Sequence, residues 1–203
     1  MPNANILGHL GLFVRRGFLS PERCRQIRGE MAAAARSPAM IRPVGAAGGV
    51  LDQATRRTGV ASVPASTTAI IEDQLRAIQP ALEEHFKLRS AGWQLPQFYI
   101  YEEGDFFAAH RDRAEDEVAP DWVKARQLSV SILLNDVSGG IDAEPHEGGT
   151  LVFYGARRDR GGAGFVVPLE SEAGMFVAFP SDWTHEVKPV TSGRRFSIVT
   201  WFL

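Results

Sequence analysis

Hydrophobic positions along this chain follow two different patterns, and the change between them falls near Ser90. Before that residue, apolar side chains recur three or four positions apart, which is typical of helices with one buried face. After it, short segments rich in β-branched and aromatic residues are separated by turn residues, which is typical of a β-sandwich or barrel. The pattern therefore predicts an α+β chain with its helices first.

Two helices are expected in the first part. One begins at Ser20-Pro21-Glu22, because serine can cap free amide groups, proline suits the first helical position and an acid favours the positive end of a helix. This helix should run to about Arg36. Residues 37–66, rich in Gly, Ala, Pro and Ser, are predicted to form an irregular connection. The second helix should span about residues 68–86, and Pro80 inside it should kink or divide it.

Eight strands are expected after Ser90. They lie near residues 94–101, 106–111, 127–135, 149–154, 164–169, 174–179, 184–189 and 195–202. Eight short strands in two sheets fit a jelly roll, with the helices covering one sheet from outside. On the last strand both faces are substantially apolar, so we expect one face to line a site and the other to meet the helices.

Composition limits the class of protein. The chain has 203 residues, which favours one domain: a helical support region over residues 1–90 and a β core over residues 91–203. A formal net charge of −2 gives no support to a nucleic-acid or anionic-membrane partner. Cys24 is the single cysteine, and the first 19 residues do not look like a secretory leader. We therefore expect a cytoplasmic protein.

The candidate chemistry starts with His110-Arg111-Asp112. Alternate side chains of a strand share a face, so His110 and Asp112 can point together while Arg111 points away. His185 would complete a set of two histidines and one carboxylate, the facial triad that holds non-haem Fe(II) and leaves coordination positions open.

A fixed cation follows on the last strand. The guanidinium of Arg195 offers a planar fork of donors that suits a carboxylate, and Ser197, two residues further along, can add a hydroxyl donor on the same face.

Taken together, these residues resemble the 2-oxoglutarate- and Fe(II)-dependent oxygenases, and among them the prolyl-hydroxylase-like branch. The resemblance covers roughly residues 93–203. The segments that carry it are Tyr101-Glu102-Glu103-Gly104, His110-x-Asp112, the strand Leu128 to Asn135, Gly148-Gly149-Thr150-Leu151, His185 and Arg195-x-Ser197.

This resemblance implies a double-stranded β-helix and a hydroxylase. The expected reaction hydroxylates a C–H bond, of a prolyl or other protein side chain, and releases succinate and CO₂. It would use Fe(II) held by His110, Asp112 and His185, with 2-oxoglutarate and O₂ as co-substrates and ascorbate as a candidate reductant. Arg195 is the expected partner of the distal carboxylate of 2-oxoglutarate, with Tyr101 and Ser197 as added donors.

One position departs from the family pattern. Several prolyl-hydroxylase-like proteins carry a tyrosine on the strand after the His-x-Asp segment, where this chain has Leu133. Co-substrate binding should then depend more on Tyr101 and Ser197. Arg126 and Trp201 fall at positions that can face the substrate.

Alternatives remain at this stage. The same chemistry on a free small molecule is one, and a metal-binding β-barrel without oxygenase activity is another, although Arg195 beside the triad disfavours it. The polar loops 111–126 and 136–148 are either lids over the site or solvated connections. Within the second loop, His146 is a candidate extra ligand or substrate contact. The sequence predicts no oligomeric state.

Overall fold

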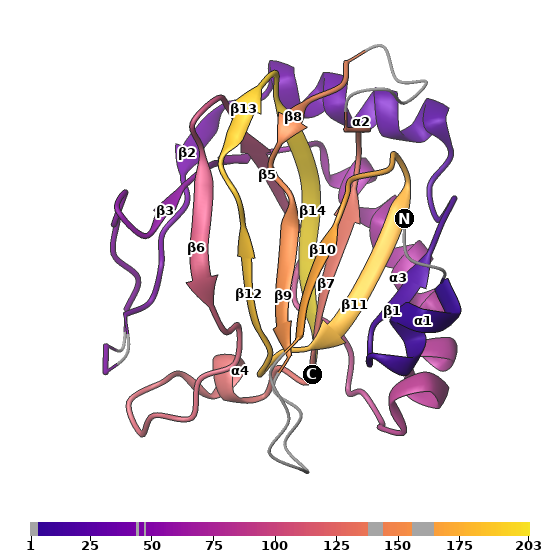
Figure 1. The fold of residues 1–203 in the computed structure, drawn as a ribbon, viewed down its shortest axis with the longest axis vertical. Coiled ribbons are helices and arrows are strands. Elements are labelled where there is room, and N and C mark those ends of the chain that lie inside the picture. The colour runs from indigo at the N-terminus through magenta and orange to yellow at the C-terminus, as the bar shows by residue number, and fades with distance from the viewer. Residues whose placement is uncertain (1–3, 44, 47, 138–143, 156–164) are drawn as a thin grey trace.

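The computed structural model describes the chain except residues 1–3, 44, 47, 138–143 and 156–164 (Figure 1). The helices are α1 (Ala4–His9), α2 (Pro21–Ala33), α3 (Ala65–Phe86) and α4 (Asp121–Lys124). The strands are β1 (Phe13–Arg15), β2 (Arg36–Pro38), β3 (Arg56–Arg57), β4 (Gly59–Ala61), β5 (Gln97–Tyr101), β6 (Phe106–His110), β7 (Leu128–Leu133), β8 (Glu147–Gly148), β9 (Leu151–Gly155), β10 (Phe165–Leu169), β11 (Met175–Pro180), β12 (Thr184–Val187), β13 (Val190–Ser192) and β14 (Arg195–Phe202).

Two antiparallel sheets face each other, as the jelly-roll prediction requires. The larger sheet has the order β1-β11-β7-β14-β5-β4-β2, and the smaller has the order β10-β9-β12-β6-β3. Strands β8 and β13 form a separate pair. Figure 1 shows β6, β12 and β9 in front of the larger sheet, with α2 and α3 behind it. The chain therefore forms three layers: small sheet, large sheet and helices.

The predicted count of eight strands was too low. Each of the eight predicted segments contains a strand, but β1, β2, β3, β4, β8 and β13 are additional. The prediction of an irregular connection over residues 37–66 was also wrong, because β2, β3 and β4 lie in or beside it. These strands have only two or three residues each. No periodicity can appear over so few residues, so their extended form depends on the neighbouring strands to which they bind.

The two main helices cover the large sheet, as expected. Ser20 caps α2 by accepting a hydrogen bond from the backbone of Arg23. The helix ends at Ala33 rather than at about Arg36, since Arg36 already belongs to β2. Pro80 does not divide α3, which is continuous over 22 residues. The buried residues of both helices pack with the outer face of the sheet; they include Cys24, Ile27, Met31, Ile71, Leu75, Ile78 and Leu82.

Both faces of β14 are apolar because each of them is buried against a different part of the protein. Phe196, Ile198 and Phe202 belong to the core beneath the helices. The alternate residues face the space between the two sheets and line a large cavity there; they are Arg195, Ser197, Val199 and Trp201. A second apolar core, which includes Phe153 and Phe179, fills the rest of the space between the sheets. The site described below is thus built into the interior of the sandwich.

No helix in the described part of the chain is long and apolar enough to cross a membrane.

Gly174 joins the segment before α2 to the large sheet. Its carbonyl oxygen accepts hydrogen bonds from the backbone N–H groups of Phe18 and Leu19, at 2.8 and 3.3 Å. Its φ is +80°, and a Cβ placed on it would lie 2.1 Å from the carbonyl oxygen of Leu19. Only glycine leaves room for this contact.

We expect Gly174→Ala to be much more destabilising than Gly17→Ala, the matched control. Gly17 also has a positive φ, but nothing lies within 4 Å of a Cβ placed there. The left-handed backbone alone should cost about 1–2 kcal/mol at either position. Overpacking against Leu19 should add ~1–3 kcal/mol at Gly174. Urea unfolding of both variants measures the difference, and equal losses would contradict the packing argument.

Candidate active site

Backbone pairing between two strands brings the two histidines together. Strands β6 and β12 are antiparallel neighbours, and His110 lies directly opposite His185 in their register. The two imidazole rings are 4.2 Å apart between centroids. Asp112 follows β6 after one residue, and its carboxylate oxygens lie 3.5 Å from Nε2 of His110 and 3.4 Å from Nε2 of His185.

Hydrogen bonds to the backbone orient both rings. Nδ1 of His110 lies 2.8 Å from the carbonyl oxygen of Ala108, and Nδ1 of His185 lies 3.1 Å from that of Trp183. Because a carbonyl oxygen only accepts, each Nδ1 must carry a proton, and Nε2 is the ring nitrogen left to bind a metal. The His110 ring also stacks on Phe107 with a centroid separation of 3.5 Å.

Electrostatics prepare these groups to act as ligands. Burial by itself would raise the pKa of Asp112, but His185 and His110 outweigh burial and hold that pKa well below its ordinary range. Burial, together with His110, lowers the pKa of His185 to about 4. Near neutral pH the site therefore offers an ionised carboxylate and, at His185, a neutral imidazole.

This donor set fits a divalent metal ion. One ligand atom from each of His110, Asp112 and His185 lies within 4.8 Å of the others. Two imidazole lone pairs and a carboxylate oxygen converge, and all three are acceptors that repel one another unless a cation lies between them. Two histidines with one carboxylate, leaving open positions, is the ligand set typical of non-haem Fe(II). The predicted triad is thus brought together in space.

The triad lines a cavity of about 620 Å³ between the two sheets. Five further residues that the sequence singled out for the co-substrate or substrate also line it: Tyr101, Arg126, Arg195, Ser197 and Trp201. A cavity of this size is in the range of small-molecule and cofactor sites.

Arg195 is a buried cation on the wall of this cavity, only 1% exposed. Its Nη1 donates to the hydroxyl of Ser197 at 3.1 Å, and its Nε has no partner. Tyr101 lies directly opposite on β5, with its ring centroid 5.3 Å from the guanidinium carbon. Burial lowers the pKa of Arg195, yet a guanidinium stays charged in proteins. Gly149 makes room for it, since a Cβ there would lie 2.8 Å from Cδ of Arg195.

Arg126 connects a metal-ligand candidate to the opposite wall. Its Nη1 donates to the carbonyl oxygen of Asp112 at 3.0 Å, and its Nε and Nη2 donate to Gln94. The guanidinium carbon lies 3.7 Å from the ring centroid of Trp201. Burial lowers the pKa of Arg126 to about 10, so it remains a cation at neutral pH. Trp201 is 6% exposed, and its Nε1 has no partner.

Three residues in or beside the cavity were missed from the sequence: Arg42 and Arg56 line it, and Gln94 contacts the lining residue Arg126. Arg42 forms an ion pair with Asp116, with nitrogen–oxygen distances of 3.2 and 2.6 Å, which joins the segment before β3 to the loop 111–126. Gln94 holds Arg126 as described. Arg56, on β3, extends its guanidinium between the rings of Tyr99 and Phe107. No local pattern identifies these residues, because each acts through partners distant in the chain.

His146 lies outside the metal-ligand cluster. It is 2% exposed and beside Gly149, and it does not line the cavity. Residues 138–143 of the loop 136–148 are outside the described residues. A lid role for this loop and for loop 111–126 stays a prediction.

Comparison with known families decides which class of site this is. The family model of the 2OG-Fe(II) oxygenase superfamily matches residues 96–203, over half of the chain. The chain belongs to this superfamily. That family implies Fe(II) as the metal and 2-oxoglutarate and O₂ as co-substrates, in agreement with the triad and with Arg195.

The curated relatives of this oxygenase chain are bacterial PKHD-type hydroxylases. The protein from Shewanella oneidensis is 32% identical over 109 residues, which are 52% of this chain and 41% of that protein. The protein from Saccharophagus degradans is 33% identical over 110 residues, 52% of this chain and 42% of that protein. This chain thus spans about two fifths of the length of the curated relatives it matches.

Solved structures share the fold over nearly the whole chain. A prolyl-4-hydroxylase from Pseudomonas putida has a TM-score of 0.71 at 22% identity, covering 98% of this chain and 95% of its own. A prolyl hydroxylase from Trichoplax adhaerens, in complex with a hypoxia-inducible-factor peptide fragment, has a TM-score of 0.68 at 16% identity, covering 98% and 86%.

We expect Asp112→Asn to abolish tight binding of Mn(II), used as a redox-stable substitute for Fe(II). The change removes the only charged ligand while keeping the shape of the side chain. Glu115→Gln is the matched control: it removes one acidic charge from the same loop, but Glu115 is exposed and does not line the cavity. Isothermal titration should give a dissociation constant raised at least roughly a hundredfold for Asp112→Asn and unchanged for Glu115→Gln. Wild-type affinity in Asp112→Asn would exclude the triad.

Proposed function

We propose that this chain is an Fe(II)- and 2-oxoglutarate-dependent hydroxylase that acts on a C–H bond of a polypeptide side chain, with proline as the first candidate, and releases succinate and CO₂. One observation carries the proposal. The convergent ligand atoms of His110, Asp112 and His185 and the unpaired, buried guanidinium of Arg195 line the same cavity. A metal and a dicarboxylate co-substrate would satisfy both.

In this proposal the triad holds the metal on one face. His110 and His185 bind through Nε2, and their Nδ1–H groups keep the rings oriented by donating to the carbonyl oxygens of Ala108 and Trp183. Asp112 supplies the negative charge. Fe(II) with 2-oxoglutarate and O₂, when bound, supplies the oxidising chemistry: oxidative decarboxylation gives succinate and CO₂, and one oxygen atom enters a C–H bond of the substrate.

Arg195 binds the distal carboxylate of the co-substrate. Its free Nε and its planar fork suit a two-point contact with a carboxylate. Ser197 keeps the guanidinium in place by accepting from Nη1, and the phenol of Tyr101 is an additional donor. Leu133 is buried opposite Ser197 and offers no hydroxyl, so the anion depends on these three residues.

Aromatic side chains keep water away from the reacting centre. Phe107 covers one face of His110, and Phe179 packs edge-on against His185 with a centroid separation of 4.7 Å. Exclusion of water strengthens each charge interaction inside the cavity and limits side reactions. On the opposite side, Arg126 holds the backbone of Asp112, and the Nε1–H of Trp201 is free to donate to a substrate.

Exposed apolar side chains favour a polypeptide substrate. Met40 and Trp122 line the cavity, yet they are 63% and 54% exposed. Large apolar groups that remain exposed beside a binding site commonly serve as contacts for a partner surface. The fold neighbour from Trichoplax adhaerens was solved with a peptide fragment, which is consistent with this preference. A metal-binding barrel without oxygenation is not retained, because the family is one of oxygenases.

Turnover tests the reaction. We expect the protein with Fe(II) and O₂ to convert 2-oxoglutarate to succinate, and prolyl peptides in a random library to gain 16 Da per hydroxylation, as detected by mass spectrometry. Asp112→Asn should form neither product. Succinate formed with metabolites but not with peptides would assign the same chemistry to a small molecule. No iron-dependent succinate formation would disprove the oxygenase proposal.

Two adjacent arginines allow a matched test of co-substrate binding. Arg195 lines the cavity, whereas Arg194 is half-buried and packs on Phe196 at the other face. Hydrogen bonds to charged groups contribute about 1.5–3 kcal/mol each, so Arg195→Ala should weaken 2-oxoglutarate binding at least roughly tenfold to a hundredfold. Arg195→Lys keeps the charge but loses the fork, and should be intermediate. Arg194→Ala should change affinity little; a greater loss there than at Arg195 would contradict the assignment.

A further inference from the structure

We propose that the primary substrate carries a carboxylate and that Arg56 binds it. This inference rests on the proposed function, because it concerns the molecule that is oxidised beside the metal. It adds a second anion site to the one formed by Arg195.

Arg56 is buried in a way that leaves only one edge of its guanidinium available. The side chain is 8% exposed, and its guanidinium carbon lies 4.3 Å from the ring centroid of Tyr99 and 4.3 Å from that of Phe107. The two rings thus occupy its two faces. A ligand must approach in the plane of the guanidinium, which is the geometry in which a carboxylate accepts from its fork of N–H groups.

No carboxylate is among the partners of these donors. Nη1 has one long contact, 3.4 Å to the carbonyl oxygen of Met40, the phenols of Tyr99 and Tyr101 interact with the guanidinium, and the buried Nε has no partner. A guanidinium has five N–H donors, and burying such groups without acceptors is costly. In the described part of the chain, Arg195 Nε and Trp201 Nε1 are the other unsatisfied buried donors that line this cavity. The three N–H groups, on Arg56, Arg195 and Trp201, can therefore donate to bound molecules.

The charges around the cavity leave Arg56 without an anion. The described residues that line the cavity include one carboxylate, Asp112, and five arginines: Arg42, Arg56, Arg111, Arg126 and Arg195. The metal uses Asp112, and the co-substrate neutralises Arg195. Arg42 is paired with Asp116, and Arg111 is exposed. Arg126 directs all three nitrogens to Gln94 and a backbone carbonyl. Among the described lining residues, Arg56 is then the buried cation that is left without a carboxylate partner.

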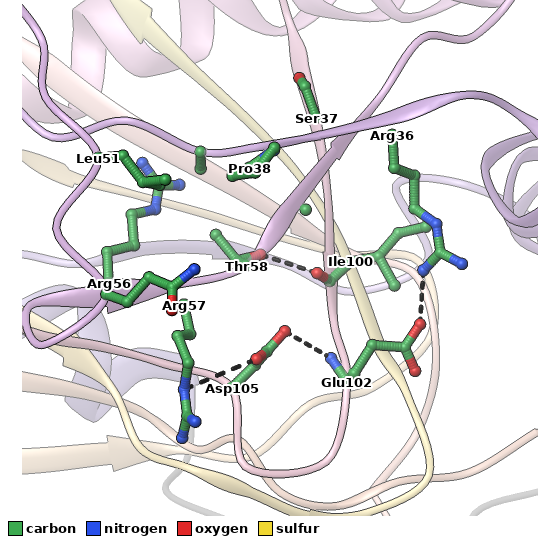
Figure 2. A pocket seen from close by; sticks show the side chains of 13 residues that line it. Arg36, Ser37, Pro38, Leu51, Arg56, Arg57, Thr58, Ile100, Glu102 and Asp105 are labelled. Atoms are coloured by element: carbon green, nitrogen blue, oxygen red, sulfur yellow. Dashed lines mark hydrogen bonds and ion pairs between the residues drawn. The ribbon is translucent and has the colours of Figure 1, made fainter.

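Two other arginines near Arg56, Arg57 on β3 and Arg36 on β2, already have partners within the protein. Figure 2 shows the side chains of Arg56 and Arg57 extending in opposite directions from β3. A smaller cavity of about 340 Å³ is lined by Arg36, Arg56 and Arg57. There Arg57 donates to the carbonyl oxygen of Gly104 at 2.5 Å and lies 4.0 Å from Asp105, and Arg36 pairs with Glu102 at 2.5 Å. Arg57 does not line the large cavity.

A ligand on Arg56 would lie near the metal ligands. His110 stacks on Phe107 at 3.5 Å, and the guanidinium of Arg56 must therefore cover the opposite face of the same ring. Arg56 belongs to the small sheet, which also carries His110 and His185, whereas Arg195 belongs to the large sheet. The two guanidinium groups therefore extend from facing sheets, and Tyr101 lies beside both of them. For this reason the test below separates substrate binding at Arg56 from co-substrate binding.

The test measures binding without turnover. Protein loaded with Mn(II) and 2-oxoglutarate in the absence of O₂ is titrated with two matched pairs of probes. One pair is a blocked prolyl peptide with Asp beside the proline and the same peptide with Asn. The other is N-acetylproline and its amide. Tryptophan fluorescence reports binding, because Trp122 and Trp201 line the cavity.

We expect the acid of at least one pair to bind roughly tenfold or more tightly than its neutral partner. In Arg56→Gln that preference should fall to about twofold or less, because the charge is lost. Arg57→Gln, the control from the same strand, should keep it. The pair that responds identifies the source of the carboxylate: an acidic residue of a polypeptide, or a small free acid. Should Arg56→Gln fail to fold, Arg56→Lys must reduce the preference at least roughly fivefold, since it loses the planar fork.

Three results would overturn the proposal: no preference for the acid in either pair, a preference that Arg56→Gln leaves intact, or a loss of 2-oxoglutarate affinity in Arg56→Gln as large as in Arg195→Ala. The last result would assign Arg56 to the co-substrate. Failure of the proposed function looks different, because Mn(II) and 2-oxoglutarate would then not bind before any probe is added.

Discussion

The antiparallel pairing of β6 with β12 is the constraint on which the site depends. It sets His110 directly opposite His185, although 185 − 110 = 75 residues separate them in the chain. Asp112 reaches both rings because it follows β6 after a single residue. A shift of one residue in this register would turn one histidine to the other face of the sheet and leave two ligands instead of three.

Buried positive charge is the second organising feature. Burial of a charge is costly unless a partner compensates for it, and arginine is the residue that tolerates burial while staying charged. Arg126 is compensated within the protein by Gln94 and the carbonyl oxygen of Asp112. Arg195 and Arg56 retain free buried donors. The proposed anion sites use these donors on both sides of the candidate metal ligands, and the large sheet is covered by two helices that support this arrangement.

The rim of the cavity differs from its buried, positively charged interior in being apolar and exposed. Met40 and Trp122 are apolar and exposed, and the ion pair between Arg42 and Asp116 joins the two segments that carry them. These segments lie outside the strands of the large sheet, so they can differ between relatives without disturbing the triad. The exposed rim is thus the part of the cavity wall where a partner surface can make contact, while the candidate metal ligands lie on or beside the strands.

The candidate chemistry and the frame of the fold were predictable from residue types and their spacing. Spacing and residue type predicted His110, Asp112, His185 and Arg195, since a strand turns alternate residues to one face and these types suit a metal and a carboxylate. The eight longer strands and the helices were predictable because their periodicity extends over several residues. The short strands β2, β3 and β4 were not predictable, because they form by pairing with strands distant in the chain, and the position of Arg56 on β3 follows from that pairing. The proposed role of Arg56 depends on its contacts with Tyr99 and Phe107, which lie more than forty residues away in the sequence. A pattern of neighbouring residues cannot reveal contacts between positions so far apart.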